Sequence, residues 1–104
     1  MVKATVIEII EYLKKSLTSN GIHLSGIALF GSQLTGIANE NSDIDMIIIS
    51  DDFKDKDIFE RGNLTMRAEL DTLNKFLIPL DILKMTNSEY KKGLENKRYV
   101  AQLI

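Results

Sequence analysis

A continuous apolar run over residues 46–49, Met-Ile-Ile-Ile, constrains the fold of this chain more than any other segment. Isoleucine is a β-branched residue that favours strands, and successive apolar residues place side chains on both faces of a strand. Such a strand is typical of a sheet that is covered on both faces. The run therefore predicts a central strand over residues 43–50, in a fold in which helices pack on a sheet.

Two segments have the apolar spacing of amphipathic helices. Through residues 6–17 the apolar side chains recur every three or four positions, and charged side chains occupy the opposite side. Gly21 then supplies a C-terminal stop, because glycine tolerates the left-handed backbone found there. The pattern predicts a first helix over residues 3–19. A second helix is predicted at about 57–76, where Phe59, Met66, Leu70, Leu73 and Leu77 recur at helical spacing.

The other elements are shorter. The apolar stretch before Gly31 predicts a first strand over residues 22–30, and the apolar run around the only proline predicts a third strand over about 79–84. Capping residues from Asn87 predict a last helical stretch that carries Tyr90, Leu94, Tyr99, Val100 and Leu103. We therefore expect an α/β (α+β) fold, a small mixed sheet of three strands with helices packed on it.

Length and charge narrow the class of protein. The chain has 104 residues, 44% of them hydrophobic, and a formal charge of −2. These values predict one folded domain over residues 1–104. A mildly acidic chain has no overall attraction to nucleic acid or to anionic membranes, so neither is an expected partner. No stretch approaches the roughly 20 apolar residues of a membrane span, and no apolar signal core is present, which predicts a cytoplasmic protein.

Metal chemistry is restricted by the side chains that the sequence offers. The chain contains no cysteine and one histidine, His23. Disulfides and thiolate metal sites are therefore excluded, and carboxylates are the expected metal ligands. Oxygen ligands favour hard cations such as Mg²⁺. We interpret His23 as a surface residue, because nothing near it in the sequence completes a site.

The stretch from Gly31 to Asp45 combines several signals of phosphate chemistry. Gly31 and Ser32 follow a predicted strand, where backbone N–H groups and a hydroxyl can bind phosphate. Asp43 and Asp45 stand two positions apart, so their carboxylates share a strand face and repel unless a cation neutralises them. Asp81 interrupts an apolar strand and would reach the same place if the second and third strands are neighbours. Three such carboxylates are typical of metal-assisted nucleotidyl transfer.

These residues carry a family resemblance. Gly31-Ser32, ten intervening residues and then Asp43-x-Asp45 resemble the Gly-Ser-x10-Asp-x-Asp signature of minimal nucleotidyltransferases in the DNA polymerase beta-like superfamily. The likeness continues through the order of elements to Asp81. It implies a polymerase beta-like fold and Mg²⁺-dependent transfer of a nucleoside monophosphate, AMP from ATP, to an acceptor hydroxyl. It also implies Asp43, Asp45 and Asp81 as catalytic metal ligands, and Gly31 and Ser32 as phosphate-binding residues.

The same resemblance implies a protein partner. Minimal nucleotidyltransferases are often paired with a small helical HEPN-domain protein, for which they act as the antitoxin and which they can modify with AMP. Larger relatives carry a further domain for the base or the acceptor, so we expect a separate polypeptide to bring the acceptor here. The family commonly has Ala-Arg-Gly in the turn where this chain has Leu34-Thr35-Gly36. The missing arginine removes a positive charge near the phosphates.

Other interpretations stay open at this point. Asp43 and Asp45 can be turn and cap residues of a solvated strand end, and Asp81 can be an edge-strand carboxylate paired with Lys84. The missing arginine also fits a catalytically silent binding module that neutralises a partner. Transfer to a small molecule is a third hypothesis, and it would need additional surface to hold the acceptor. The apolar last residue, Ile104, predicts a tail docked on the sheet or on a second subunit of a homo-oligomer.

Overall fold

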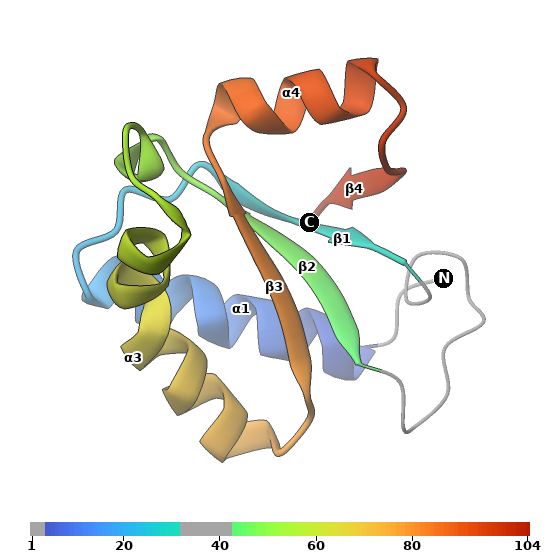
Figure 1. Cartoon of the computed structure of the whole chain (residues 1–104). Coiled ribbons are helices and arrows are strands. Elements are labelled where there is room, and N and C mark those ends of the chain that lie inside the picture. The colour runs from blue at the N-terminus through green and yellow to red at the C-terminus, as the bar shows by residue number, and fades with distance from the viewer. Residues whose placement is uncertain (1–3, 32–42) are drawn as a thin grey trace.

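The computed structural model describes residues 4–31 and 43–104, and it has a four-stranded mixed sheet at its centre (Figure 1). The order across the sheet is β3-β2-β1-β4. β2 runs parallel to β3 and antiparallel to β1, and β4 is antiparallel to β1. The expected α/β fold with a small mixed sheet is confirmed. The strands are β1 (Gly26–Phe30), β2 (Ile44–Ile49), β3 (Leu80–Met85) and β4 (Ala101–Leu103).

Two helices, α1 (Ala4–Ser19) and α3 (Ile58–Phe76), cover one face of the sheet. The apolar stripe of α1 is buried against alternate strand residues such as Ile27 and Met46, which are fully buried as well. Ala68 is the buried residue of α3 in this main core, and the partly buried Phe76 of the same helix packs against it. The predicted positions of both helices are therefore correct to within a residue or two.

The opposite face is covered by α4 (Asn87–Glu95), as Figure 1 shows above the end of β3. Tyr90 of α4 packs with Ile47 and Ile49 of β2 in a second, smaller core. Tyr99 stacks on Tyr90 with 5.9 Å between ring centroids. Side chains of β2 are thus buried on both faces, which is what the isoleucine run predicts.

The last part of the chain differs from the prediction. The helix ends at Glu95 and does not continue through Tyr99 and Leu103, and the sheet has four strands instead of three. Lys97 adopts a left-handed backbone with φ +54, which ends the helical path. Residues 101–103 then pair with the free edge of β1. The backbone N–H of Ile104 donates to Ile27 at 3.0 Å, so the tail docks on the sheet.

The predicted start of β1 is also wrong. Residues 22–25 do not belong to the strand, which begins at Gly26. The backbone N–H of Ile22 donates to Leu17 at the end of α1, and that of His23 donates to Asp52. Asp52 lies in a short 3-10 helix, η1 (Asp51–Phe53), between β2 and α3. Contacts with the end of α1 and with η1 therefore hold the segment that alternation alone assigns to a strand.

None of the described helices is long and apolar enough to cross a lipid bilayer.

Candidate functional site

Pairing of β2 with β3 brings two of the predicted carboxylates together. Asp45 and Asp81 are register partners in the parallel ladder, so their side chains extend from the same face. Both strands begin at this end of the sheet, whereas α4 covers the same face at the other end (Figure 1). Asp45 is partly buried and Asp81 is exposed. The arrangement places a pair of like charges beside an accessible sheet edge.

Gly31 lies beside this pair, on the β1 side of Asp45. It follows β1, and because β1 is antiparallel to β2, its end lies beside the start of β2. The backbone of Gly31 is left-handed, with φ +74, a conformation that glycine adopts without steric cost. A Cβ atom on Gly31 would collide with the carboxylate of Asp45. Only glycine therefore allows the chain to pass so close to Asp45.

The electrostatics of the site centre on Asp45. Burial raises the pKa of the Asp45 carboxyl, and the negative charge of Asp81, a side-chain hydrogen bond with Asp81 and the charge of Asp43 raise it further. Each of these causes disfavours the ionised form of Asp45. A bound cation would reverse that balance, because it stabilises neighbouring carboxylates in their charged form.

The donor set fits a hard cation such as Mg²⁺, which prefers carboxylate oxygens. Mg²⁺ commonly takes one or two protein carboxylates and completes its shell with water and substrate phosphates. Asp45 and Asp81 meet that requirement as a pair. Within residues 4–31 and 43–104, no group of three acidic or histidine side chains converges as metal ligands. The charge of Asp43 therefore helps to raise the pKa of Asp45, but Asp43 does not complete a three-carboxylate cluster.

The predicted site residues fall into two groups. Gly31, Asp43, Asp45 and Asp81 lie at the same edge of the sheet, around the start of β2. Ser32, the predicted helical turn after it and Leu34-Thr35-Gly36 lie outside the residues that the structure describes. The phosphate-binding role of the turn therefore stays a prediction.

The alternative pairing of Asp81 with Lys84 is wrong. Three positions separate them on β3, so their side chains leave opposite faces of the strand. Lys84 Nζ lies 3.0 Å from Glu69 Oε2 on the α3 side. Asp81 shares its face with Asp45 instead.

His23 lies on the surface, as expected, with 89% of its side chain exposed. Its backbone N–H donates to Asp52 Oδ2 at 2.7 Å, and its ring nitrogen Nδ1 lies 3.2 Å from Asp52 Oδ1. The backbone hydrogen bond is the main reason that the pKa of Asp52 is lowered. This contact holds the segment before β1 against η1, so the role of His23 is structural.

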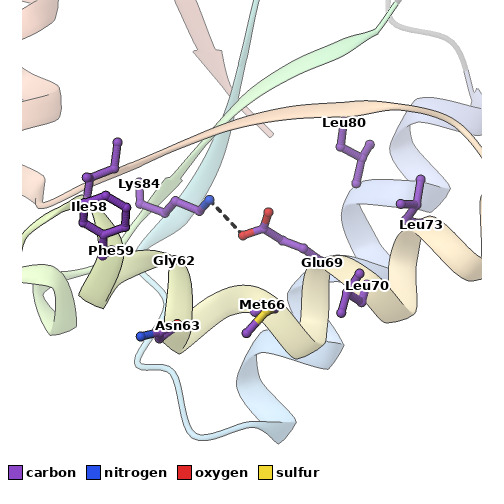
Figure 2. A pocket seen from close by; sticks show the side chains of 10 residues that line it. All are labelled: Ile58, Phe59, Gly62, Asn63, Met66, Glu69, Leu70, Leu73, Leu80 and Lys84. Atoms are coloured by element: carbon purple, nitrogen blue, oxygen red, sulfur yellow. Dashed lines mark ion pairs between the residues drawn. The ribbon is translucent and has the colours of Figure 1, made fainter.

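Sequence reasoning missed a groove of about 420 Å³ between α3 and β3. Figure 2 shows Glu69 of α3 and Lys84 of β3 reaching toward each other across it. Leu80 and Lys84 line the groove, and both leave β3 on the face opposite Asp81. The groove is therefore separate from the carboxylate pair. The signal for it was the apolar stripe of α3, which does not face the core.

Comparison with models of protein families identifies the type of domain. A family model for the nucleotidyltransferase domain matches residues 7–102. A candidate nucleotidyltransferase from Sulfolobus solfataricus has a similar structure, with a TM-score of 0.62, 20% identity, and coverage of 99% of this chain and 87% of that one. A second candidate nucleotidyltransferase gives a TM-score of 0.57 at 25% identity, with coverage of 98% and 99%.

A third similar structure is described as a toxin-antitoxin with AMP-PNP. It gives a TM-score of 0.50 at 27% identity, and the match covers 71% of this chain and 55% of that one. No curated protein sequence matches this chain significantly.

Proposed function

Since this chain belongs to the nucleotidyltransferase domain family, we propose that it transfers AMP from ATP to an acceptor hydroxyl in a Mg²⁺-dependent reaction. The observation that carries this proposal is the Asp45–Asp81 pair beside Gly31. Two carboxylates on neighbouring strands repel, and burial of one of them adds to the cost. A carboxyl group whose charge is disfavoured in this way is typical of a functional site, because a ligand relieves the repulsion.

The proposed step is a substitution at phosphorus. The acceptor oxygen forms a bond to the α-phosphorus of ATP, the bond from that phosphorus to the bridging oxygen breaks, and pyrophosphate leaves. Asp45 and Asp81 would hold Mg²⁺, and Asp43, the third ligand that the family resemblance implies, would have to move toward them to join the site. The ion when bound supplies positive charge to the triphosphate. Asp81 is the more exposed carboxylate of the pair and would accept the proton of the hydroxyl.

Two further residues would bind the phosphates. The backbone at Gly31 passes directly beside the Asp45 carboxylate, so a phosphate held there would lie next to the cation. Ser32 would add its hydroxyl.

We place the acceptor hydroxyl on a small helical HEPN-domain protein, for which this chain would act as a cytoplasmic antitoxin. The similar structure described as a toxin-antitoxin with AMP-PNP supports a nucleotide-binding domain in such a system. This chain spans about half of that protein's length, so the acceptor and the partner are part of the proposal.

The test is transfer of label from ATP labelled at the α-phosphate. We expect the partner chain to be labelled when Mg²⁺ and this protein are present, and labelling to be lost in the Asp45→Asn variant. Asp71→Asn, a change at an exposed aspartate on α3, is the matched control and should keep full labelling. If the native protein labels the partner no better than Asp45→Asn, the proposed activity is wrong.

A catalytically silent binding module is the second candidate function. It is favoured by the finding that the described residues form no three-ligand metal group. Calorimetric titration separates the two functions, because an active transferase binds ATP with a Mg²⁺-dependent heat. A silent module would bind the partner without that heat. Labelling of a small alcohol in the absence of any protein partner would instead support transfer to a small molecule.

A further inference from the structure

The helix α3 carries an apolar stripe that the core leaves exposed. Of the twelve large apolar side chains that are exposed in the described part of the chain, seven lie on α3 or on the residue that caps it. Phe59 and Leu77, at the two ends of the stripe, are each 79% exposed. The buried face of α3 is made of the small residues Thr65, Ala68 and Thr72.

The spacing of this stripe is that of a seam between two helices. Six positions, 59, 63, 66, 70, 73 and 77, are separated alternately by four and three residues, and all except Asn63 are apolar. This alternation is the heptad pattern in which one helix packs along another. α3 has 19 residues, so a second helix could cover the seam over about 28 Å. We call these six positions the α3 seam.

The groove beside the α3 seam accommodates a helix better than a strand. It is lined by seam residues and by Leu80 and Lys84 of β3, and the Lys84–Glu69 ion pair spans it (Figure 2). Arg61 Nη1 donates to the backbone oxygen of Lys84 at 3.0 Å, and Pro79 stands before the start of β3. Both features shorten the edge of β3 that an added strand could pair with.

We propose that the α3 seam packs against the α3 seam of a second copy of this chain, antiparallel about a two-fold axis. An axis level with residue 68 brings every seam position opposite another seam position. Each opposed pair contains at least one apolar side chain, and each pair occurs twice in the dimer. The pairs are Phe59 with Leu77, Asn63 with Leu73, and Met66 with Leu70.

Charges beside the α3 seam match those of a second copy. On the β3 side, Glu69 would approach Glu69 of the second copy, and each glutamate already has its own Lys84 at 3.0 Å. On the other side, Arg67 would approach Arg67 of the second copy, with Asp71 one turn further along each helix. Near the two-fold axis each flank thus combines equal numbers of positive and negative charges, whereas Glu60 lies further along the helix. Close to the axis, a strongly acidic or basic foreign helix would find no complementary field.

This dimer leaves the carboxylate site accessible. α3 packs on the face of the sheet to which Ile82 of β3 contributes, whereas Asp45 and Asp81 extend from the opposite face. The inference is therefore independent of the proposed transferase activity.

The first test is the oligomeric state, measured by sedimentation velocity over a wide range of protein concentration. We expect the native chain to form dimers, and a Met66→Glu, Leu70→Glu double variant to be monomeric. Val100→Glu, which changes an apolar residue that is 79% exposed elsewhere, is the control and should remain dimeric. Circular dichroism checks that all three proteins are folded. A native chain that stays monomeric at every concentration overturns the proposal and leaves the seam to a different helical partner.

The second test uses the absence of cysteine from the chain. In the antiparallel dimer the two Arg67 positions face each other, whereas the two Glu60 positions on the same flank lie about 24 Å apart along the helix axis. A short bis-maleimide should therefore cross-link the Arg67→Cys variant into dimers and leave Glu60→Cys uncross-linked. Equal cross-linking of the two variants would contradict the antiparallel arrangement.

Discussion

Replacing Asp45 by asparagine should make the metal-free protein more stable. Asp45 stands directly opposite Asp81 on the neighbouring strand, and its own burial adds to the cost of its charge. Asparagine has nearly the same shape and carries no charge. The Asp45→Asn variant therefore removes the repulsion and leaves the packing around Gly31 unchanged.

The size of the effect follows from the strand pairing. Like charges directly opposite on neighbouring strands destabilise a sheet by up to about 1 kcal/mol, with about 0.2 kcal/mol as a lower bound. For a domain of this size, 1 kcal/mol corresponds to a change in Tm of about 4–8 °C. We therefore expect the Tm of Asp45→Asn to exceed that of the native chain by about 1–8 °C near neutral pH.

The pH dependence has a definite sign. The pKa of Asp45 in the folded state is raised above 3.8, so the folded chain binds this proton more tightly than the unfolded chain does. Stability from this residue is therefore fully present below pH 3.8 and is lost as the pH rises through the folded-state pKa. The advantage of Asp45→Asn should accordingly be largest near neutral pH and should disappear in acid.

Asp52 provides a matched control with the opposite sign. Its pKa is lowered, chiefly by the backbone hydrogen bond from His23, so its charged form stabilises the fold. Stability from Asp52 is present above pH 3.8 and is lost as the pH falls through its folded-state pKa. We expect Asp52→Asn to lower the Tm near neutral pH, in contrast to Asp45→Asn.

The assay is thermal unfolding followed by circular dichroism, with EDTA and then with Mg²⁺ and ATP. Ligands that bind the folded state raise the Tm, so Mg²⁺ and ATP should stabilise the native chain. They should not stabilise Asp45→Asn. A lower Tm for Asp45→Asn than for the native chain in EDTA would refute the reasoning, because it would mean that the charge of Asp45 makes a net favourable contact.

Two glycines give further predictions, each with a control, measured by urea unfolding. Gly31→Ala should destabilise the protein by more than the roughly 1–2 kcal/mol that a left-handed backbone costs an alanine, because the new Cβ atom would also collide with the Asp45 carboxylate. Gly21 is the control: its backbone is also left-handed, but a Cβ atom there would meet open space. Gly21→Ala should therefore show the cost of the backbone conformation alone. Equal losses in the two variants would argue against the close approach at Gly31. Gly93→Ala should destabilise the protein because its Cβ atom meets the ring of Tyr99, whereas Gly62→Ala on α3, with open space around it, should stabilise it by about 1 kcal/mol. Stabilisation by both would show that Tyr99 moves aside freely.

Much of the local structure was predictable from the sequence. The positions of α1 and α3 follow from periodicity, and the burial of β2 on both faces follows from the run of isoleucines. These features depend on neighbours within a few residues, and the backbone geometry of helices and strands converts such spacing into faces. The choice of Asp45 and Gly31 as site residues came from short-range spacing and a family resemblance in the same way.

Contacts between distant segments were decided by the tertiary structure alone. Parallel pairing of β2 with β3 places Asp81 beside Asp45, and no pattern within either strand specifies that register. The same applies to β4, because its three residues form a strand only where the edge of β1 is free. α3 is the clearest case. Its sequence has an apolar stripe, but the face that is buried in the core is the one with small side chains, around Ala68. Periodicity defines the faces of a helix, and the close packing of α3 against α1 and β3 determines which face is buried.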